Sequence, residues 1–103
     1  MTLKRQILSL IEREWEVLRE QYRVRRIGLF GSCLRGEERA DSDVDVLVEF
    51  DQKTFDNYMG LKFFLEDHLD RRVDLVIADS IKPRLREAIL QEVEYAAGAA
   101  SIR

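Results

Sequence analysis

Cysteine is almost absent from this sequence, with Cys33 the only one in 103 residues. An internal disulfide and a cysteine-rich zinc site are therefore excluded. The only histidine, His68, lies far from Cys33 in the sequence, so the two do not suggest a zinc site together. No apolar run approaches the ~20 residues that a membrane-spanning helix needs. Residues 1–11 also lack the apolar segment of a signal peptide, so a cytoplasmic location is the default expectation.

A strong charge of one sign is also missing, because the net charge is −3. Such a surface offers no strong field for nucleic acid, and we expect neither direct nucleic-acid binding nor membrane association. The charges are unevenly distributed along the chain, however. Residues 37–56 contain eight Asp or Glu against two Lys or Arg. This acidic block suits a cation better than a phosphate backbone.

Apolar residues make up 46% of the chain and charged residues 36%, which is typical of a globular protein. The length predicts a single domain over residues 1–103, with a frayed tail at about 99–103. Apolar periodicity predicts alternating helices and strands. The expected helices are 3–22, a short one within 31–36, 55–69 and one starting at 80–83; the expected strands are 23–30, 43–50 and 73–78. This order predicts an α/β (α+β) fold with a small central sheet.

Two aspartates stand in the second predicted strand. Side chains two residues apart in a strand point to the same face, so Asp43 and Asp45 share one face. Val44, Val46 and Val48 share the other, which must be the core face. An Asp-x-Asp pair at the start of a strand is also common in turns, so the pair alone does not establish a metal site.

A third aspartate, Asp74, occupies the next strand in the segment RRVDLVI. If the two strands are neighbours, Asp74 can lie beside Asp43 and Asp45. Carboxylates this close repel one another, and burial raises the cost of keeping them ionised. A divalent cation relieves both effects, and all-carboxylate ligands suit Mg²⁺ or Mn²⁺.

Gly31-Ser32 precedes the aspartates by ten intervening residues. A glycine between a strand and a helix lets a ligand approach the backbone closely. The following N–H groups and the Ser32 hydroxyl can then hold a phosphate. A phosphate-binding turn facing a group of carboxylates is the arrangement that a metal-bound nucleoside triphosphate requires.

The spacing from Gly31-Ser32 to Asp43-Val44-Asp45 resembles the signature of the DNA polymerase β-type nucleotidyltransferase superfamily. The fuller strings GSCLRG at 31–36 and SDVDVLV at 42–48 are similar to its minimal branch, the minimal nucleotidyltransferase (MNT) family. The segments RRVDLVI and IKPRLREAILQEVEYA are similar to the usual end of that branch. The resemblance therefore covers roughly residues 3–96 and implies the nucleotidyltransferase fold, a small mixed sheet flanked by helices.

The resemblance also implies roles for particular residues. Gly31 and Ser32 would bind the triphosphate, and Asp43 and Asp45 would hold two Mg²⁺ ions, with Mn²⁺ as an alternative. Asp74 would be the third catalytic carboxylate and metal ligand, with the option of taking the proton of the acceptor hydroxyl. The implied reaction is in-line attack on the α-phosphate of ATP, releasing pyrophosphate.

Other residues have more than one interpretation. Arg35 either reaches a nucleotide phosphate or pairs with Glu37 or Glu38 at the surface. Cys33 is interpreted as a small filler of the core rather than as a catalytic group. Ser42 is expected to cap the turn before the strand.

We expect no separate acceptor-binding domain within these 103 residues. Minimal nucleotidyltransferases are typically paired with a small helical HEPN protein, often a toxic RNase. The resemblance thus implies an antitoxin of a type VII-like pair, transferring AMP from ATP to a hydroxyl, expected to be tyrosine, of a HEPN toxin. The alternatives are a non-catalytic antitoxin that neutralises its partner by binding, and a transferase acting on a small molecule. Either a homo-oligomer or a hetero-oligomer is compatible with the sequence.

Overall fold

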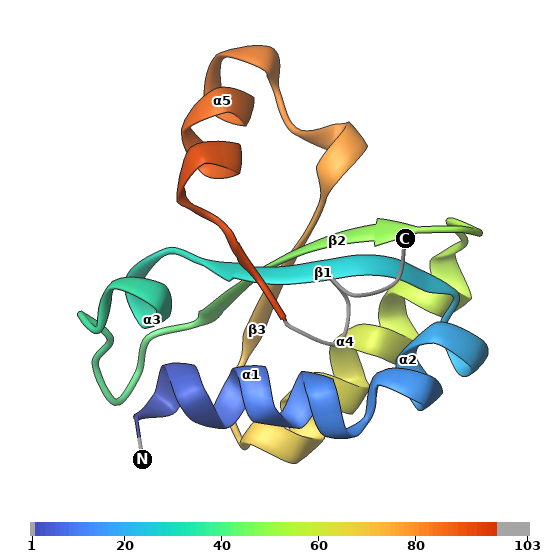
Figure 1. The fold of residues 1–103 in the computed structure, drawn as a ribbon, viewed down its shortest axis with the longest axis horizontal. Coiled ribbons are helices and arrows are strands. Elements are labelled where there is room, and N and C mark those ends of the chain that lie inside the picture. Colours follow the sequence, from blue (N-terminus) through green and yellow to red (C-terminus); the bar gives the residue numbers. More distant parts are fainter. Residues whose placement is uncertain (1, 97–103) are drawn as a thin grey trace.

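The computed structural model describes residues 2–96. A four-stranded mixed sheet forms the centre of the molecule, and most of its helices pack on one side of this sheet (Figure 1). The predicted fold class is therefore confirmed. The strand order is β3-β2-β1-β4. The strands are β1 (Val24–Phe30), β2 (Val44–Phe50), β3 (Val73–Ile77) and the short β4 (Glu94–Tyr95). Strand β2 runs antiparallel to β1 and parallel to β3, and β4 runs antiparallel to β1.

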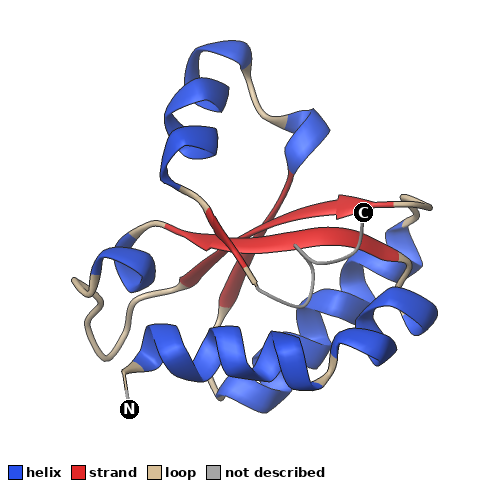
Figure 2. Cartoon of the chain, viewed as in Figure 1, coloured by secondary structure: helices blue, strands red, loops and turns tan. Residues whose placement is uncertain are grey.

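One face of this sheet is covered by helices, as Figure 2 shows. They are α1 (Leu3–Arg13), α2 (Trp15–Gln21) and α4 (Phe55–Leu69). Their buried side chains include Ile7, Ile11, Leu18, Leu61 and Leu65, which are fully buried. These side chains form the core together with Val44, Val46 and Val48 of β2, as the alternating sequence predicts. The opposite face of β2, which carries Asp45, is thereby turned away from the three helices.

The remaining elements lie at the ends and on the other side of the sheet. Helix α3 (Ser32–Arg35) follows β1 directly, and the 3₁₀ turn η1 (Ala78–Ser80) follows β3. Helix α5 (Pro83–Glu92) stands off the sheet on the side opposite to the three core helices (Figure 1). None of its residues is buried. This helix therefore contributes little to the core and lies on the same side as the acidic face of β2.

The structure differs from the sequence-based expectation at three places. The helix predicted over residues 3–22 is divided at Glu14, whose backbone (φ −101°, ψ 17°) leaves the helical region. The apolar spacing continues across this break without glycine or proline, so the sequence contains no signal for it. Ser32, expected to cap the short helix, is its first residue, and Gly31 takes the cap position. Strand β4 was not predicted, because two residues show no periodicity.

Two further observations bear on the sequence predictions. Across residues 2–96, every helix falls short of the length and apolar character needed to cross a membrane. The tail predicted at 99–103 lies outside the described residues.

Candidate active site

The two neighbouring strands β2 and β3 bring Asp45 and Asp74 side by side. The residues are direct partners in the parallel register, so their side chains leave the same face of the sheet next to each other. Burial raises the pKa of Asp45 to about 6, and the negative charges of Asp74 and Asp43 add to this effect. A carboxyl group with a pKa this high is costly to keep ionised at neutral pH, and such groups are frequent at functional sites.

Asp43 lies one position before β2, at the edge of this pair. Its Oδ1 atom is 3.3 Å from Nε of Arg72, and 46% of its side chain is exposed. Arg72 also accepts a hydrogen bond from the Val44 N–H at its carbonyl oxygen, at 2.9 Å. As placed, the side chains of residues 2–96 contain no cluster of three or more acidic, histidine or cysteine residues with the geometry of a metal site. Of the three predicted carboxylates, the structure thus brings two together and leaves the third engaged by an arginine.

Gly31 packs directly against the Asp45 carboxylate. Its backbone has φ +79° and ψ −157°, a combination that is essentially restricted to glycine. A Cβ atom at this position would overlap the Asp45 carboxylate and would lie 2.9 Å from its Cγ atom. The chain can place the turn after β1 this close to the carboxylate pair only because residue 31 has no side chain.

The turn at Gly31 and the short helix α3 already hold a carboxylate in this structure. The Gly31 N–H donates a hydrogen bond to Oε1 of Glu92 at 2.6 Å, and Nη1 of Arg35 lies 2.6 Å from Oε2 of the same residue. These contacts, the Gly31 hydrogen bond above all, lower the pKa of Glu92. Arg35 also donates from Nε to Oε1 of Glu37 at 2.9 Å, so the surface pairing considered in the sequence analysis is present. Ser32, the first residue of α3, is half-buried beside these groups.

Glu92 is the residue of this site that the sequence analysis missed. It comes 61 residues after Gly31, at the end of a helix whose other charged side chains face solvent. No local spacing connects it to the turn. Only the return of the chain from α5 through Val93 into β4, which pairs with Gly28 and Leu29, brings it there.

The remaining candidates have structural roles. Cys33 is fully buried, and burial raises the pKa of its thiol, which confirms the interpretation as a core filler. The Ser42 hydroxyl accepts a hydrogen bond from the Arg39 N–H at 2.7 Å, as expected for a turn cap.

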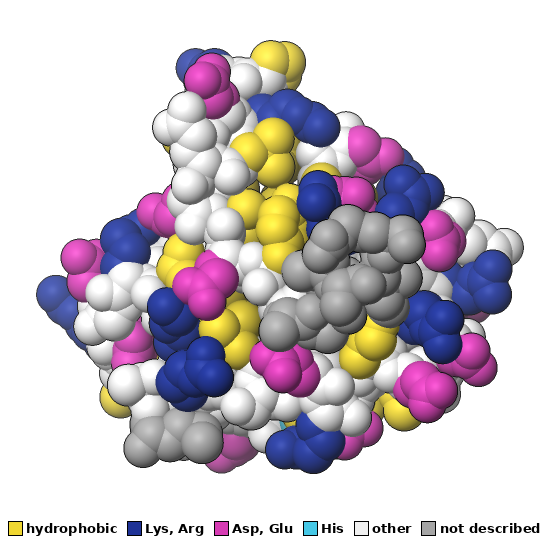
Figure 3. Space-filling view, in the orientation of Figure 1, with side chains coloured by type: hydrophobic (Ala, Val, Ile, Leu, Met, Phe, Trp, Pro, Cys, Tyr) yellow, Lys and Arg dark blue, Asp and Glu magenta, His cyan; other side chains and the backbone are white. Residues whose placement is uncertain are grey.

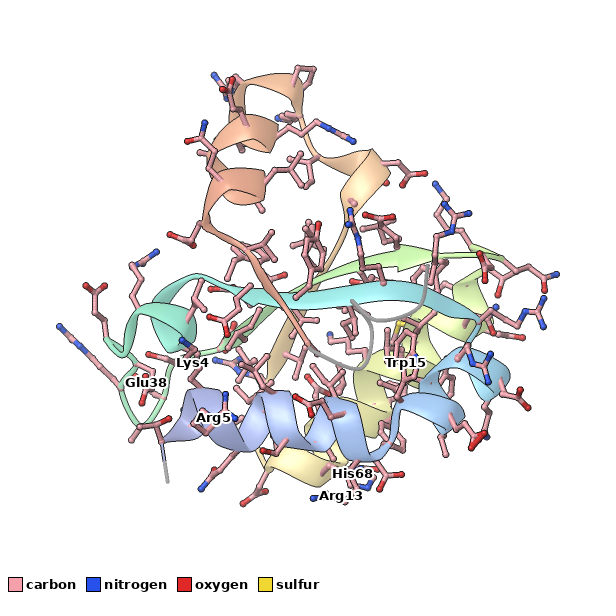
Figure 4. The ribbon with its side chains drawn as sticks, viewed as in Figure 1. Lys4, Arg5, Arg13, Trp15, Glu38 and His68 are labelled. Carbon is pink, nitrogen blue, oxygen red and sulfur yellow. The ribbon has the colours of Figure 1, made fainter. Side chains whose placement is uncertain are left out.

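His68 lies beside Arg13 on the helical side of the molecule, remote from the acidic strand face (Figure 4). Its Nδ1 atom is 2.9 Å from the Phe64 carbonyl oxygen.

Basic and acidic side chains are interspersed on the face that Figure 3 shows. Arg25 pairs with Asp51 at 2.9 Å and Arg26 with Glu49 at 2.8 Å. Arg25 and Arg26 are therefore both paired with acidic side chains.

A mixed sheet with a glycine turn packed against one of two paired strand carboxylates is the arrangement expected from the resemblance to nucleotidyltransferases. The comparison with protein families agrees, because the nucleotidyltransferase domain matches residues 11–96. The chain belongs to this family, and the resemblance noted from its motifs is confirmed.

Individual proteins of known name or structure are also similar to the chain. The protein adenylyltransferase MntA of Thermococcus cleftensis is 42% identical over 91 residues, which cover 87% of this chain and 92% of that protein. A candidate minimal nucleotidyltransferase of known structure superimposes with a TM-score of 0.75 at 38% identity, covering 91% of this chain and 95% of the other. A crystal structure of a toxin–antitoxin pair with AMP-PNP gives a TM-score of 0.68 at 26% identity, covering 84% of this chain and 73% of the matched one.

Proposed function

We propose that this chain is an adenylyltransferase that transfers AMP from ATP to a hydroxyl group of a HEPN toxin, expected to be a tyrosine, and so acts as an antitoxin. The observation that carries the proposal is the pairing of Asp45 with Asp74, with the Asp45 carboxylate directly against Gly31. The similarity to a protein adenylyltransferase supports AMP as the transferred group and a protein as the acceptor. The similarity to a toxin–antitoxin chain crystallised with an ATP analogue supports the antitoxin role.

The carboxylates fit a hard divalent cation. Asp45 and Asp74 supply only oxygen ligands, and a cation would relieve both the burial of the Asp45 charge and its repulsion by Asp74, the two causes that raise the pKa of Asp45 most. Asp43 would complete the ligand set by leaving its ion pair with Arg72 and binding the metal instead. When bound, Mg²⁺ or Mn²⁺ would neutralise phosphate charge and polarise the acceptor oxygen, and two such ions are the arrangement that the family resemblance implies.

The chain's own groups then have separate tasks. The Gly31 N–H, the Ser32 hydroxyl and the Arg35 guanidinium would bind phosphate oxygens of the nucleotide. Asp74 would take the proton of the acceptor hydroxyl. The acceptor oxygen forms a bond to the α-phosphorus, the bond from that phosphorus to the bridging oxygen breaks, and pyrophosphate leaves with the electron pair.

A non-catalytic antitoxin is the second candidate, and one observation favours it. In this structure Glu92 occupies the Gly31 and Arg35 donors, and Arg72 engages Asp43, so the groups needed for catalysis are in part engaged by other residues. Neutralisation by binding would need neither ATP nor free carboxylates.

Labelled ATP separates these candidates. The chain is mixed with its HEPN partner, Mg²⁺ and ATP labelled at either the α- or the γ-phosphate. Adenylyl transfer predicts that only the α-label becomes attached to the partner and that peptide mapping locates it on a hydroxyl side chain. Suppression of toxicity with no label on the partner would reject the transferase in favour of the binding protein. Attachment of the γ-label would indicate a kinase and reject both.

A further inference from the structure

The side chain of Glu92 occupies the two groups that are best placed to bind a nucleotide phosphate. Its two carboxylate oxygens each accept one hydrogen bond at 2.6 Å, one from the Gly31 N–H and one from Arg35. A carboxylate and a phosphate are both anions with oxygen acceptors, so they compete for the same donors. The donors cannot serve both anions fully, and the two negative charges would repel each other at this distance.

The helix that carries Glu92 is weakly attached to the rest of the molecule. None of the residues of α5 is buried, and Leu85 and Leu90 are 50% and 38% exposed. Apart from the Glu92 contacts, a hydrogen bond from Nη1 of Arg86 to the Ala78 carbonyl oxygen, at 2.9 Å, links α5 to the turn after β3. Displacing the Glu92 side chain and shifting α5 therefore costs little buried apolar surface, while β4, which begins two residues after Glu92, keeps its pairing with β1.

We propose that Glu92 is an internal substitute for the nucleotide phosphate, and that ATP binding displaces it from Gly31 and Arg35 and releases the end of α5. The proposal rests on the proposed nucleotide-binding function. Glu92 thereby sets the affinity for ATP, since each binding event must first break its two hydrogen bonds. It also couples occupancy of the site to the position of α5.

The test compares the affinity of three forms of the full-length chain for a non-transferable α,β-methylene analogue of ATP with Mg²⁺, measured by calorimetry. The forms are the wild type, Glu92→Gln, and the control Glu87→Gln. Glu87 lies on the same helix and contacts only Gln91 among the described hydrogen bonds, at 3.2 Å, so its replacement changes the net charge equally without touching the site. Thermal unfolding of each form verifies that it is folded.

We expect Glu92→Gln to bind the analogue about three- to tenfold more tightly than the wild type, and Glu87→Gln to bind within twofold of it. A threefold gain corresponds to the free energy of a partly exposed ion pair, and a tenfold gain to that of a charge-assisted hydrogen bond. Equal or weaker binding by a folded Glu92→Gln variant would overturn the proposal while leaving the nucleotide site intact. If neither the wild type nor Glu92→Gln binds the analogue, the proposed function itself fails, and this inference fails with it.

Hydrogen exchange of the wild type gives a second readout that depends on no variant. Saturation with the analogue should increase amide exchange in the peptide that covers α5, while exchange decreases around Gly31. A purely structural role of Glu92 would produce no such opposite changes. Protection of both segments by the analogue would show that α5 closes over the nucleotide, which contradicts displacement.

Discussion

Asp45 and Asp74 are direct neighbours across the parallel pair of β2 and β3, and the carboxylate of Asp45 lies against the backbone of Gly31. The two residues are 29 positions apart in the chain, yet the register leaves no freedom in their spacing. A charge pair of this kind destabilises the protein that carries it, which is why it indicates function rather than packing.

Replacing Asp45 by asparagine should stabilise the metal-free protein at neutral pH. The folded-state pKa of Asp45 is raised to about 6 from 3.8, so its protonated form is favoured by folding. This contribution is fully present below pH 3.8 and is lost as the pH rises through about 6. The difference in melting temperature, Asp45→Asn minus wild type, should grow between pH 4 and 7 to roughly 2–6 °C, a range reduced because the side chain is partly exposed. A difference in melting temperature that stays constant across this pH range would contradict the raised pKa of Asp45.

Divalent-cation binding should be pH-dependent for the same reason. Below pH 6 the cation must displace a proton from Asp45, so the apparent affinity should rise with pH and level off above about 7. Calorimetry with Mn²⁺ and without nucleotide measures this directly. An affinity that does not change between pH 5 and 7.5 would place the cation away from Asp45.

ATP binding should in turn depend on the cation. Phosphate charge approaching Asp45 and Asp74 is repelled unless a cation lies between them. We expect at least a tenfold weaker affinity for ATP in the presence of a chelator than with Mg²⁺. Equal affinity in the two conditions would reject a carboxylate site that binds nucleotide through metal.

Gly31→Ala should impair both stability and nucleotide binding, whereas Gly36→Ala should affect stability alone. Gly31 has a backbone conformation restricted to glycine, and an added Cβ atom would overlap Asp45. We expect a loss of about 2 kcal/mol or more in urea unfolding, with loss of ATP binding. Gly36 also has positive φ, at +74°, but nothing lies within 4 Å of an added Cβ, so only about 1 kcal/mol should be lost. Indistinguishable behaviour of the two variants would argue against close packing at Gly31.

The sequence predicts the parts of the site that depend on alternation within one strand. The valines of β2 determine which face Asp45 takes, and the glycine before α3 indicates the tight turn. The prediction for Asp74 required the order of the strands, which the sequence only suggests and the parallel register establishes in the structure. Two contacts of the site could not be predicted from local sequence patterns. Arg72 forms an ion pair with Asp43 at the start of the strands, and Glu92, 61 positions after Gly31 in the sequence, accepts a hydrogen bond from the Gly31 N–H.

The division between core and site also explains which substitutions should be tolerated. Val44, Val46 and Val48 are fully buried on one face of β2, while Asp43 and Asp45 extend toward the other side. Removing the two charges should therefore leave the fold intact, and activity can be tested without the complication of unfolding.

The most direct test of the account is the intact mass of the HEPN partner after incubation with ATP, Mg²⁺ and either the wild-type chain or the double variant Asp43→Asn with Asp45→Asn. We predict that the wild type adds whole AMP units to the partner, and that the double variant adds none while its melting temperature is equal to or higher than that of the wild type. An unmodified partner with the wild type, or equal modification by a folded double variant, would contradict catalysis by these aspartates.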